Sequence, residues 1–230
     1  MKSKLVLFGA STTARVIYKF VKDYDLYDII GFVQDKEYKT EETYCGLPIY
    51  DFESLKEVFN KETDYLFVAV QWNRLNGDRK QLYTRLKGEG YRLANIISPT
   101  AIIHGTMKGD NCWICDYVVV ENDAEIGSDV FVKTKSTIQH NTIVEDHCFI
   151  ASHTLFAGDV HIGEQSYIGV ASVVFNGVKI GKKCIIGGGV TVKRHVPDFT
   201  LVKTPNDFFI TKTYTENEIE NKMLASIMIR

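Results

Sequence analysis

The second half of the chain repeats an apolar residue at every sixth position. Stepping by six from Ile102 to Val192 meets an aliphatic or aromatic residue at every step except Lys108, and the residues two places earlier, from Cys112 to Val190, are mostly small. Positions two apart on a strand share a face, so each six-residue unit directs one large and one small side chain inward. An α-helix, with about 3.6 residues per turn, would spread this period over all of its faces. The pattern therefore predicts a parallel β-helix of about five triangular coils, three units to a coil.

An antiparallel β-sandwich is the alternative for this region. Irregular turns separate the strands of a sandwich, and such strands would not keep one phase over so many steps. Glycine also recurs just after the aliphatic position, for example at Gly127, Gly163 and Gly181, where a tight corner favours a residue without Cβ. The β-helix is the better interpretation.

Strand and helix patterns alternate before the repeat. We expect strands at residues 4–9, 29–33, 65–70 and 94–97, and helices at 11–24, 51–59 and 79–89. This alternation predicts a small Rossmann-like parallel α/β sheet. The predicted domains are 1–97 for this sheet, 98–198 for the β-helix and 199–230 for a short C-terminal tail with a helix at 215–228.

A ligand of the first domain is expected at the carboxyl ends of its strands, near Gly9, Asp35 and Asn73. The turn after the first strand keeps only the first glycine of the dinucleotide fingerprint, so a nicotinamide cofactor is not expected. The helix that begins at Ser11 and Thr12 can still hold the phosphate of a smaller nucleotide. The alternative is that Gly9 serves only the packing of a tight turn.

Composition and charge narrow the classes of function. The formal net charge of -2 and the pI near 6.3 give no basic field for nucleic acid. The N-terminal apolar run has strand length and no cleavage site, so we expect neither a signal peptide nor a membrane span, and a cytoplasmic location. The five scattered cysteines fit free thiols, and the pair Cys112 and Cys115 follows from the repeat and is too small a set for a structural zinc site.

His140 is the candidate general base of the β-helix. It follows Ile138 by two residues, at a corner where side chains point away from the core, and imidazole titrates near neutral pH. Steps of one coil predict a column of His104, Asn122, His140, Gly158 and Asn176 along this corner. Gly158 leaves space over His140 and exposes a backbone N–H that can stabilise an oxyanion. The alternative is that His140 is an ordinary solvated turn residue.

Three segments carry a resemblance to a known family: Leu-Phe-Gly-Ala-Ser at 7–11, Gly-Phe-Val-Gln-Asp at 31–35 and Lys-Ser-Thr-Ile-Gln-His at 135–140. They resemble the PglD and NeuD family of bacterial hexapeptide-repeat sugar acetyltransferases, related to GDP-perosamine N-acetyltransferase. The resemblance implies left-handed coils, a sugar nucleotide bound to the first domain, and acetyl-CoA between the β-helices of a homotrimer. It also implies N-acetylation of a nucleotide-linked amino-dideoxy sugar in lipopolysaccharide or other surface-glycan biosynthesis.

The resemblance and the pattern together assign the site residues. The catalytic set is His140, Asn141 and Gly158, with no metal. The acetyl-CoA set is Gly158, Lys182, Lys183, Gly188 and Lys193, where the lysines can equally form a merely solvated cationic face. The sugar-nucleotide set is Gly9, Ser11, Thr12, Asp35, Asn73, Arg79, Asn122 and Lys133.

The chain departs from the family pattern at three places: Thr12 and Thr13 replace glycine-histidine, Asn141 replaces an acidic residue, and the end after Pro197 is unusual. Two alternative functions therefore stay open. One is O-acetylation of a sugar such as sialic acid, and the other is a non-catalytic β-helix binding module. A zinc carbonic anhydrase is not expected, because no two histidines are five residues apart.

Overall fold

The computed structural model describes residues 2–71 and 73–204, and the helix predicted at 215–228 lies outside them. The N-terminal domain is a five-stranded sheet in the order β3-β4-β2-β1-β5, parallel except for the β3–β4 hairpin. Its strands are β1 (Lys4–Phe8), β2 (Asp28–Gln34), β3 (Thr43–Tyr44), β4 (Leu47–Asp51) and β5 (Tyr65–Val68). The parallel α/β prediction is confirmed, and the hairpin is an addition that the sequence pattern did not indicate.

Two helices flank this sheet. Helix α1 (Thr12–Asp23) begins where Ser11 caps the backbone N–H of Ala14, as its position before the apolar period predicts. Helix α2 spans Asn73–Gly88, but Arg74, Leu75 and Asn76 have left-handed φ values, so the regular right-handed helix follows Asn76, close to the predicted start at residue 79. The helix predicted at 51–59 is wrong, because only a short 3₁₀ segment, η2 (Phe52–Glu57), forms there; a second one is η1 (Lys36–Tyr38).

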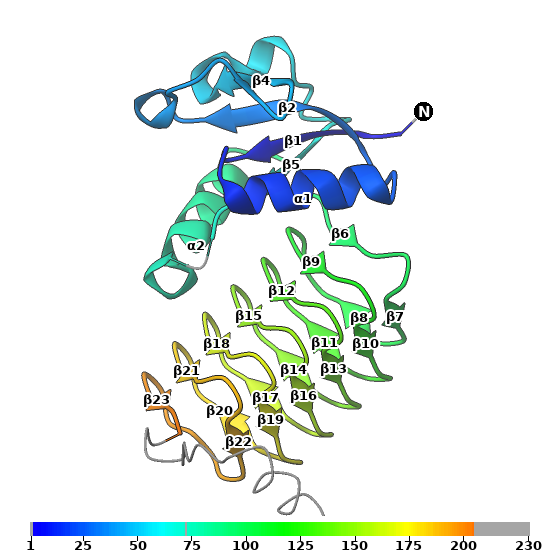
Figure 1. Cartoon of the computed structure of the whole chain (residues 1–230), viewed down its shortest axis with the longest axis vertical. Coiled ribbons are helices and arrows are strands. Elements are labelled where there is room, and N and C mark those ends of the chain that lie inside the picture. The colour runs from blue at the N-terminus through cyan, green and yellow to red at the C-terminus, as the bar shows by residue number, and fades with distance from the viewer. Residues whose placement is uncertain (1, 72, 205–230) are drawn as a thin grey trace, which may run out of the picture.

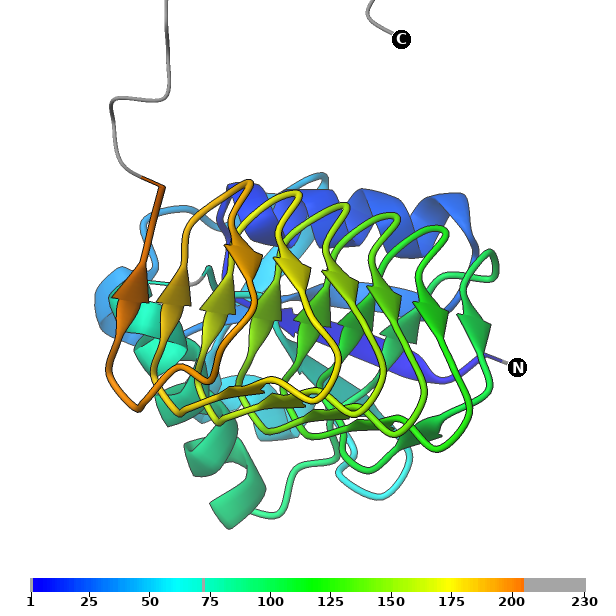
Figure 2. The same ribbon diagram turned by 90° about the horizontal axis from the view of Figure 1, so that it is seen from below.

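The remaining described chain winds into a β-helix of three parallel sheets, and its rungs stand side by side in Figure 2. One sheet holds β7 (Ile102–Ile103), β10 (Val119–Val120), β13 (Thr137–Ile138), β16 (Leu155–Phe156), β19 (Val173–Val174) and β22 (Thr191–Val192). A second holds β8 (Thr106–Met107), β11 (Glu125–Ile126), β14 (Ile143–Val144), β17 (His161–Ile162) and β20 (Lys179–Ile180). The third holds β6 (Ile96–Ile97), β9 (Trp113–Ile114), β12 (Phe131–Val132), β15 (Phe149–Ile150), β18 (Tyr167–Ile168), β21 (Ile185–Ile186) and β23 (Leu201–Val202).

The interior of the prism is built as the repeat predicts from Cys112 onward. The large residues at every sixth position and the small residues two places earlier are all buried in one core. The small positions include hydroxyls, which need partners when buried. Ser136, Ser166 and Ser172 donate to backbone carbonyls of the next coil at 2.8–2.9 Å. The parallel β-helix is confirmed.

The first coil has a different register from the one predicted. Ile103, rather than Ile102, pairs with Val120, and Met107, rather than Lys108, pairs with Ile126. Ile102 is 52% exposed, and Lys108 therefore occupies an outward position and is no break in the apolar series. His104 consequently lies over Glu121, as its N–H bonds to the carbonyl of Val120, and the prediction that His104 stacks on Asn122 is wrong.

The two domains pack through a shared apolar core. Helix α1 lies between the N-terminal sheet and the β-helix, and α2 descends along one edge of the prism (Figure 1). Residues Ala14, Ile17 and Val21 of α1 share a buried cluster with Trp113 and Phe131 of the β-helix. The ring of Phe67 at the end of β5 also stacks on Phe131, with centroids 5.8 Å apart. These contacts fix how the domains sit on each other.

Candidate active site

The corner that carries His140 lies between β13 and β14. Its turn, residues 139–142, stacks on equivalent turns: the N–H of Asn141 donates to the carbonyl of Asn122 below, and the N–H of Asp159 donates to the carbonyl of His140. We call this turn, with the stacked residues Asn122 and Gly158, the His140 corner. The His140 side chain is exposed, and no residue of the described chain hydrogen-bonds its ring. A ring nitrogen is thus free to take a proton from a ligand.

Gly158 lies directly against the imidazole of His140. A Cβ built on Gly158 would stand 2.2 Å from Cε1 and 2.5 Å from Nε2 of His140, so no other residue fits there without displacing the ring. The backbone N–H of Gly158 has no hydrogen-bond partner within residues 2–71 and 73–204. One corner therefore presents a proton acceptor and an unpaired hydrogen-bond donor beside each other.

Two carboxylates next to His140 are not among the residues predicted from the sequence. Glu121 Oε2 accepts the backbone N–H of His140 at 3.1 Å, and Asp159 Oδ1 accepts from Asn141 Nδ2 at 3.0 Å. The amide of Asn141 thus binds Asp159 and not the ring of His140. Glu121 and Asp159 each lie one coil from the turn, and that coil spacing is the signal that would have identified them.

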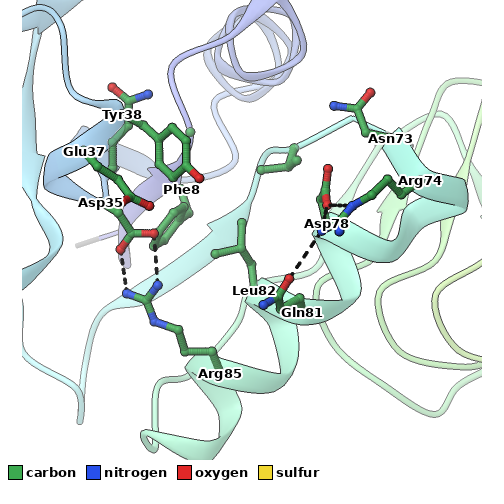
Figure 3. A pocket seen from close by; sticks show the side chains of 13 residues that line it. Phe8, Asp35, Glu37, Tyr38, Asn73, Arg74, Asp78, Gln81, Leu82 and Arg85 are labelled. Atoms are coloured by element: carbon green, nitrogen blue, oxygen red, sulfur yellow. Dashed lines mark hydrogen bonds and ion pairs between the residues drawn. The ribbon is translucent and has the colours of Figure 1, made fainter.

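A cavity of about 680 Å³ opens at the carboxyl ends of β1, β2 and β5, where a ligand was predicted (Figure 3). Charged and amide side chains line it: Asp35 binds Arg85 through two hydrogen bonds of 2.7 and 3.0 Å, and Arg74 pairs with Asp78. The hydrogen bond to Asp35 raises the pKa of Arg85. Fixed guanidinium and carboxylate groups of this kind can read the polar edges of a nucleotide.

The structure divides the predicted sugar-nucleotide residues into two groups. Gly9, Asp35 and Asn73 line the cavity, and Ser11 and Thr12 begin α1 two residues beyond Gly9. Arg79 does not reach the cavity. It is fully buried against the β-helix, where its guanidinium binds Asp129, so the prediction that it holds the nucleotide is wrong.

The other two predicted sugar-nucleotide residues, Asn122 and Lys133, also lie away from the cavity. Asn122 belongs to the His140 corner, one coil below the histidine. The ammonium of Lys133 lies over the ring of Trp113, 3.2 Å from its centroid, on the face of the prism beneath α1. This contact makes Lys133 a packing partner of Trp113 in the single chain, and burial lowers its pKa.

The predicted acetyl-CoA residues are spread over three corners of the prism. Lys193 shares the corner of His140 and Gly158, and its ammonium lies 5.3 Å from the ring centroid of Phe175. Lys182 and Lys183 stand at the corner that α2 follows, and Gly188 stands at the third corner. One copy of the chain therefore does not bring this set together.

The cysteines are buried structural residues in the part of the chain that the structure describes, apart from the half-buried Cys45. Burial raises the pKa of Cys112 to about 12 and that of Cys115 to about 11, so these thiols stay protonated at neutral pH. Within the described ranges, no cluster of three His, Cys, Asp or Glu side chains is arranged to hold a metal ion. No described helix is both long and apolar enough to span a bilayer.

Comparison with known proteins places both domains. Residues 4–86 match the family model of the PglD N-terminal domain. The structure is similar to the acetyltransferase domain of PglB from Neisseria gonorrhoeae, with 23% identity over 86% of this chain and 95% of that chain and a TM-score of 0.75. The structure of that domain in complex with acetyl coenzyme A matches with 22% identity over 88% of this chain and 96% of that chain, and a TM-score of 0.75.

PerB from Caulobacter crescentus, in complex with CoA and GDP-perosamine, matches with 26% identity over 86% of this chain and 93% of that chain, and a TM-score of 0.75. These neighbours confirm the prediction of an acyltransferase. The chain therefore combines a domain that matches the PglD N-terminal domain with a left-handed β-helix, and its structure is similar to those of sugar acetyltransferases.

Proposed function

We propose that the protein transfers the acetyl group of acetyl-CoA to the amino group of a nucleotide-linked amino-dideoxy sugar, with His140 as general base. The observation that carries this proposal is the exposed imidazole of His140, which has no hydrogen-bond partner in the described chain and lies against Gly158. Acyl transfer from a thioester needs a base, a donor for the oxyanion and positioned substrates. The His140 corner supplies the first two.

The reaction proceeds by direct attack and without a covalent enzyme intermediate. The sugar amine attacks the thioester carbonyl carbon while a ring nitrogen of His140 takes a proton from the amine. The N–H of Gly158 donates to the carbonyl oxygen as it gains negative charge. The carbon–sulfur bond then breaks, and the imidazolium returns the proton to the sulfur of coenzyme A. Asn141, whose amide is engaged by Asp159, holds the turn that carries the base.

The sugar nucleotide binds in the cavity of the N-terminal domain. Support comes from its place at the carboxyl ends of parallel strands, from the family match over residues 4–86, and from PerB, whose structure contains GDP-perosamine. The start of α1 at Ser11 and Thr12 offers backbone N–H groups to the phosphates, and Gly9, whose own N–H binds the carbonyl of Val33, lines the cavity beside them. Asp35 and Asn73 supply polar contacts to the rest of the nucleotide.

The working enzyme is a homotrimer in this proposal, because one copy does not complete the site. The cavity adjoins the edge of the prism that α2 follows, whereas His140 stands at the next corner. Apolar side chains on both sides of the His140 corner are exposed in the single chain: Ile143 by 39%, Leu155 by 37% and Phe175 by 45%. A neighbouring copy and the pantetheine arm of acetyl-CoA would cover them, and could bring Lys182, Lys183 and Gly188 to the coenzyme of the next subunit.

We place the reaction in the cytoplasm, in the synthesis of lipopolysaccharide or another surface glycan, since activated amino sugars serve as glycan precursors. The chemistry of the His140 corner suits an amine and a hydroxyl acceptor alike. O-acetylation of a sugar therefore remains the second candidate function, and a binding module without catalysis the third.

An acceptor screen tests the proposal. Purified protein is incubated with acetyl-CoA and with 4-amino sugars linked to GDP, UDP or dTDP, and the release of coenzyme A is followed with a thiol reagent. We expect turnover with at least one amino sugar and none with its 4-hydroxy counterpart. Turnover with hydroxyl acceptors alone would support the O-acetyltransferase, and binding of nucleotides without any release of coenzyme A would support the binding module.

A further inference from the structure

The two faces of helix α2 contact different parts of the molecule. One face lines the cavity of the N-terminal domain with Asn73, Arg74, Asp78, Gln81, Leu82 and Arg85. The other face lies on the edge of the β-helix between the second and third sheets. The wall of the cavity is therefore held by residues of the other domain, and those residues control where the wall stands.

The edge beneath α2 is a ladder of polar turn residues, one from each coil. Asn111, Asp129, His147 and Gln165 follow one another at steps of 18 residues, all with a left-handed backbone at φ 55–61°. Polar residues at turns normally face water. These four are at most 7% exposed: α2 packs on Asp129, His147 and Gln165, and Asn111 accepts the backbone N–H of Val68 in β5. We call them the corner ladder.

The central contact between α2 and the corner ladder is a buried ion pair. Arg79 Nε donates to Asp129 Oδ1 at 2.9 Å, and Nη2 donates to the carbonyls of Asp129 and Cys148 at 2.9 and 3.2 Å. The other oxygen of Asp129 meets His147 Nδ1 at 2.9 Å. Both side chains of the ion pair are fully buried, so this contact anchors the middle of the helix.

The first turn of α2, which carries Asn73 and Arg74 into the cavity, is held separately. Arg74, Leu75 and Asn76 have left-handed φ values of 46–62°, a conformation that costs non-glycine residues free energy. Gln165 Nε2 donates to the carbonyl of Leu75 at 3.0 Å, and Asn76 Nδ2 donates to the carbonyl of His147 at 2.9 Å. The β-helix thus holds this turn in place.

One turn further along the helix, Lys80 binds Glu164 of the same coil as Gln165, with Nζ and Oε1 2.5 Å apart. The hydrogen bond from Lys80 lowers the pKa of Glu164, so the pair is ionised at neutral pH. Gln165 and Lys80 are thus two independent links between the cavity wall and one coil of the prism.

We infer that Gln165 and the Lys80–Glu164 pair are positioning residues for the sugar nucleotide, although they lie in or against the β-helix and line no part of the cavity. This inference rests on the proposed function of the cavity as the nucleotide site. The links keep the turn that bears Asn73 and Arg74 in its binding position. Their loss lets that turn move and weakens nucleotide binding, while the His140 corner, on another edge, keeps its geometry.

Steady-state kinetics of Gln165→Ala and Lys80→Met test the inference with the first nucleotide sugar that the wild-type protein acetylates. Each variant should raise KM for the nucleotide sugar about 3- to 10-fold, the worth of one hydrogen bond, with kcat and the KM for acetyl-CoA within about twofold. Lys80→Arg, which keeps the ion pair, should retain the wild-type KM. Lys108→Met is the matched control, because it removes a surface pair with Glu125 that does not touch α2.

Calorimetric titration with GDP, UDP and dTDP tests the positioning role separately from the nucleotide site itself. If the wild-type protein binds one of these nucleotides and Gln165→Ala and Lys80→Met bind it equally well, the positioning role is wrong while the nucleotide site stands. An equal rise of both KM values in the variants would likewise overturn the inference, because it would indicate general loosening. If the wild-type protein binds no nucleoside diphosphate and acetylates no nucleotide sugar, the proposed function fails and the inference fails with it.

Discussion

His140 and His147 stand at consecutive corners of one coil and have opposite surroundings. His147 is 5% exposed, lies beneath α2 and binds Asp129, whereas His140 faces outward with no hydrogen bond to its ring in the described chain. The same repeat generates both positions. The difference lies in burial. Helix α2 covers the corner of His147, whose polar residues bind one another and the helix, whereas the corner of His140 is exposed and can contact a substrate.

Substitution at the covered corner, beneath α2, should lower the stability of the protein. Arg79→Met leaves Asp129 buried without its cation, and breaking a buried pair in this way costs about 3–5 kcal/mol. We expect a large fall in the urea midpoint. The double variant Arg79→Met/Asp129→Asn, which removes the stranded charge, should recover part of the loss. A single variant as stable as the wild type would show that the two corners do not differ in this respect.

Substitution at the open corner, which carries His140, should lower the rate of catalysis. Gly158→Ala places a Cβ within 2.5 Å of two ring atoms of His140 and pushes the ring out of position. Misplacing a reacting group by about 1 Å can cost up to about 100-fold, so we expect kcat to fall about 10- to 100-fold with little change in the urea midpoint. Gly88→Ala is the control, since open space surrounds that glycine. Unchanged turnover in Gly158→Ala would mean that the ring does not act from its present place.

The sequence predicts most of the β-helix correctly but not its first coil. The six-residue period locates the core residues from Cys112 to Val190 and puts His140 at a corner, because these depend on local strand geometry. It misplaces the first coil, where the adjacent apolar residues Ile102 and Ile103 allow two phases and only pairing with Val120 decides between them.

The prediction for Arg79 is wrong because its contacts also depend on residues that are distant in the sequence. Its partner, Asp129, is 50 residues away in the sequence and belongs to the β-helix. The left-handed turn at residues 74–76 also depends on tertiary contact, since Gln165 donates to the carbonyl of Leu75. One signal was available in advance: polar residues recur at steps of 18 from Asn111 to Gln165, along the edge that α2 covers.

Turnover by His140→Asn, compared with His153→Asn, tests the role of the open corner most directly. His153 is also exposed, at the third corner, and asparagine tolerates its left-handed φ of 59°. With the first amino-sugar nucleotide that the wild type acetylates, kcat should fall by about 10²- to 10⁴-fold in His140→Asn and stay within about twofold in His153→Asn. Release of coenzyme A by His140→Asn at the wild-type rate would contradict the assignment of His140 as the base.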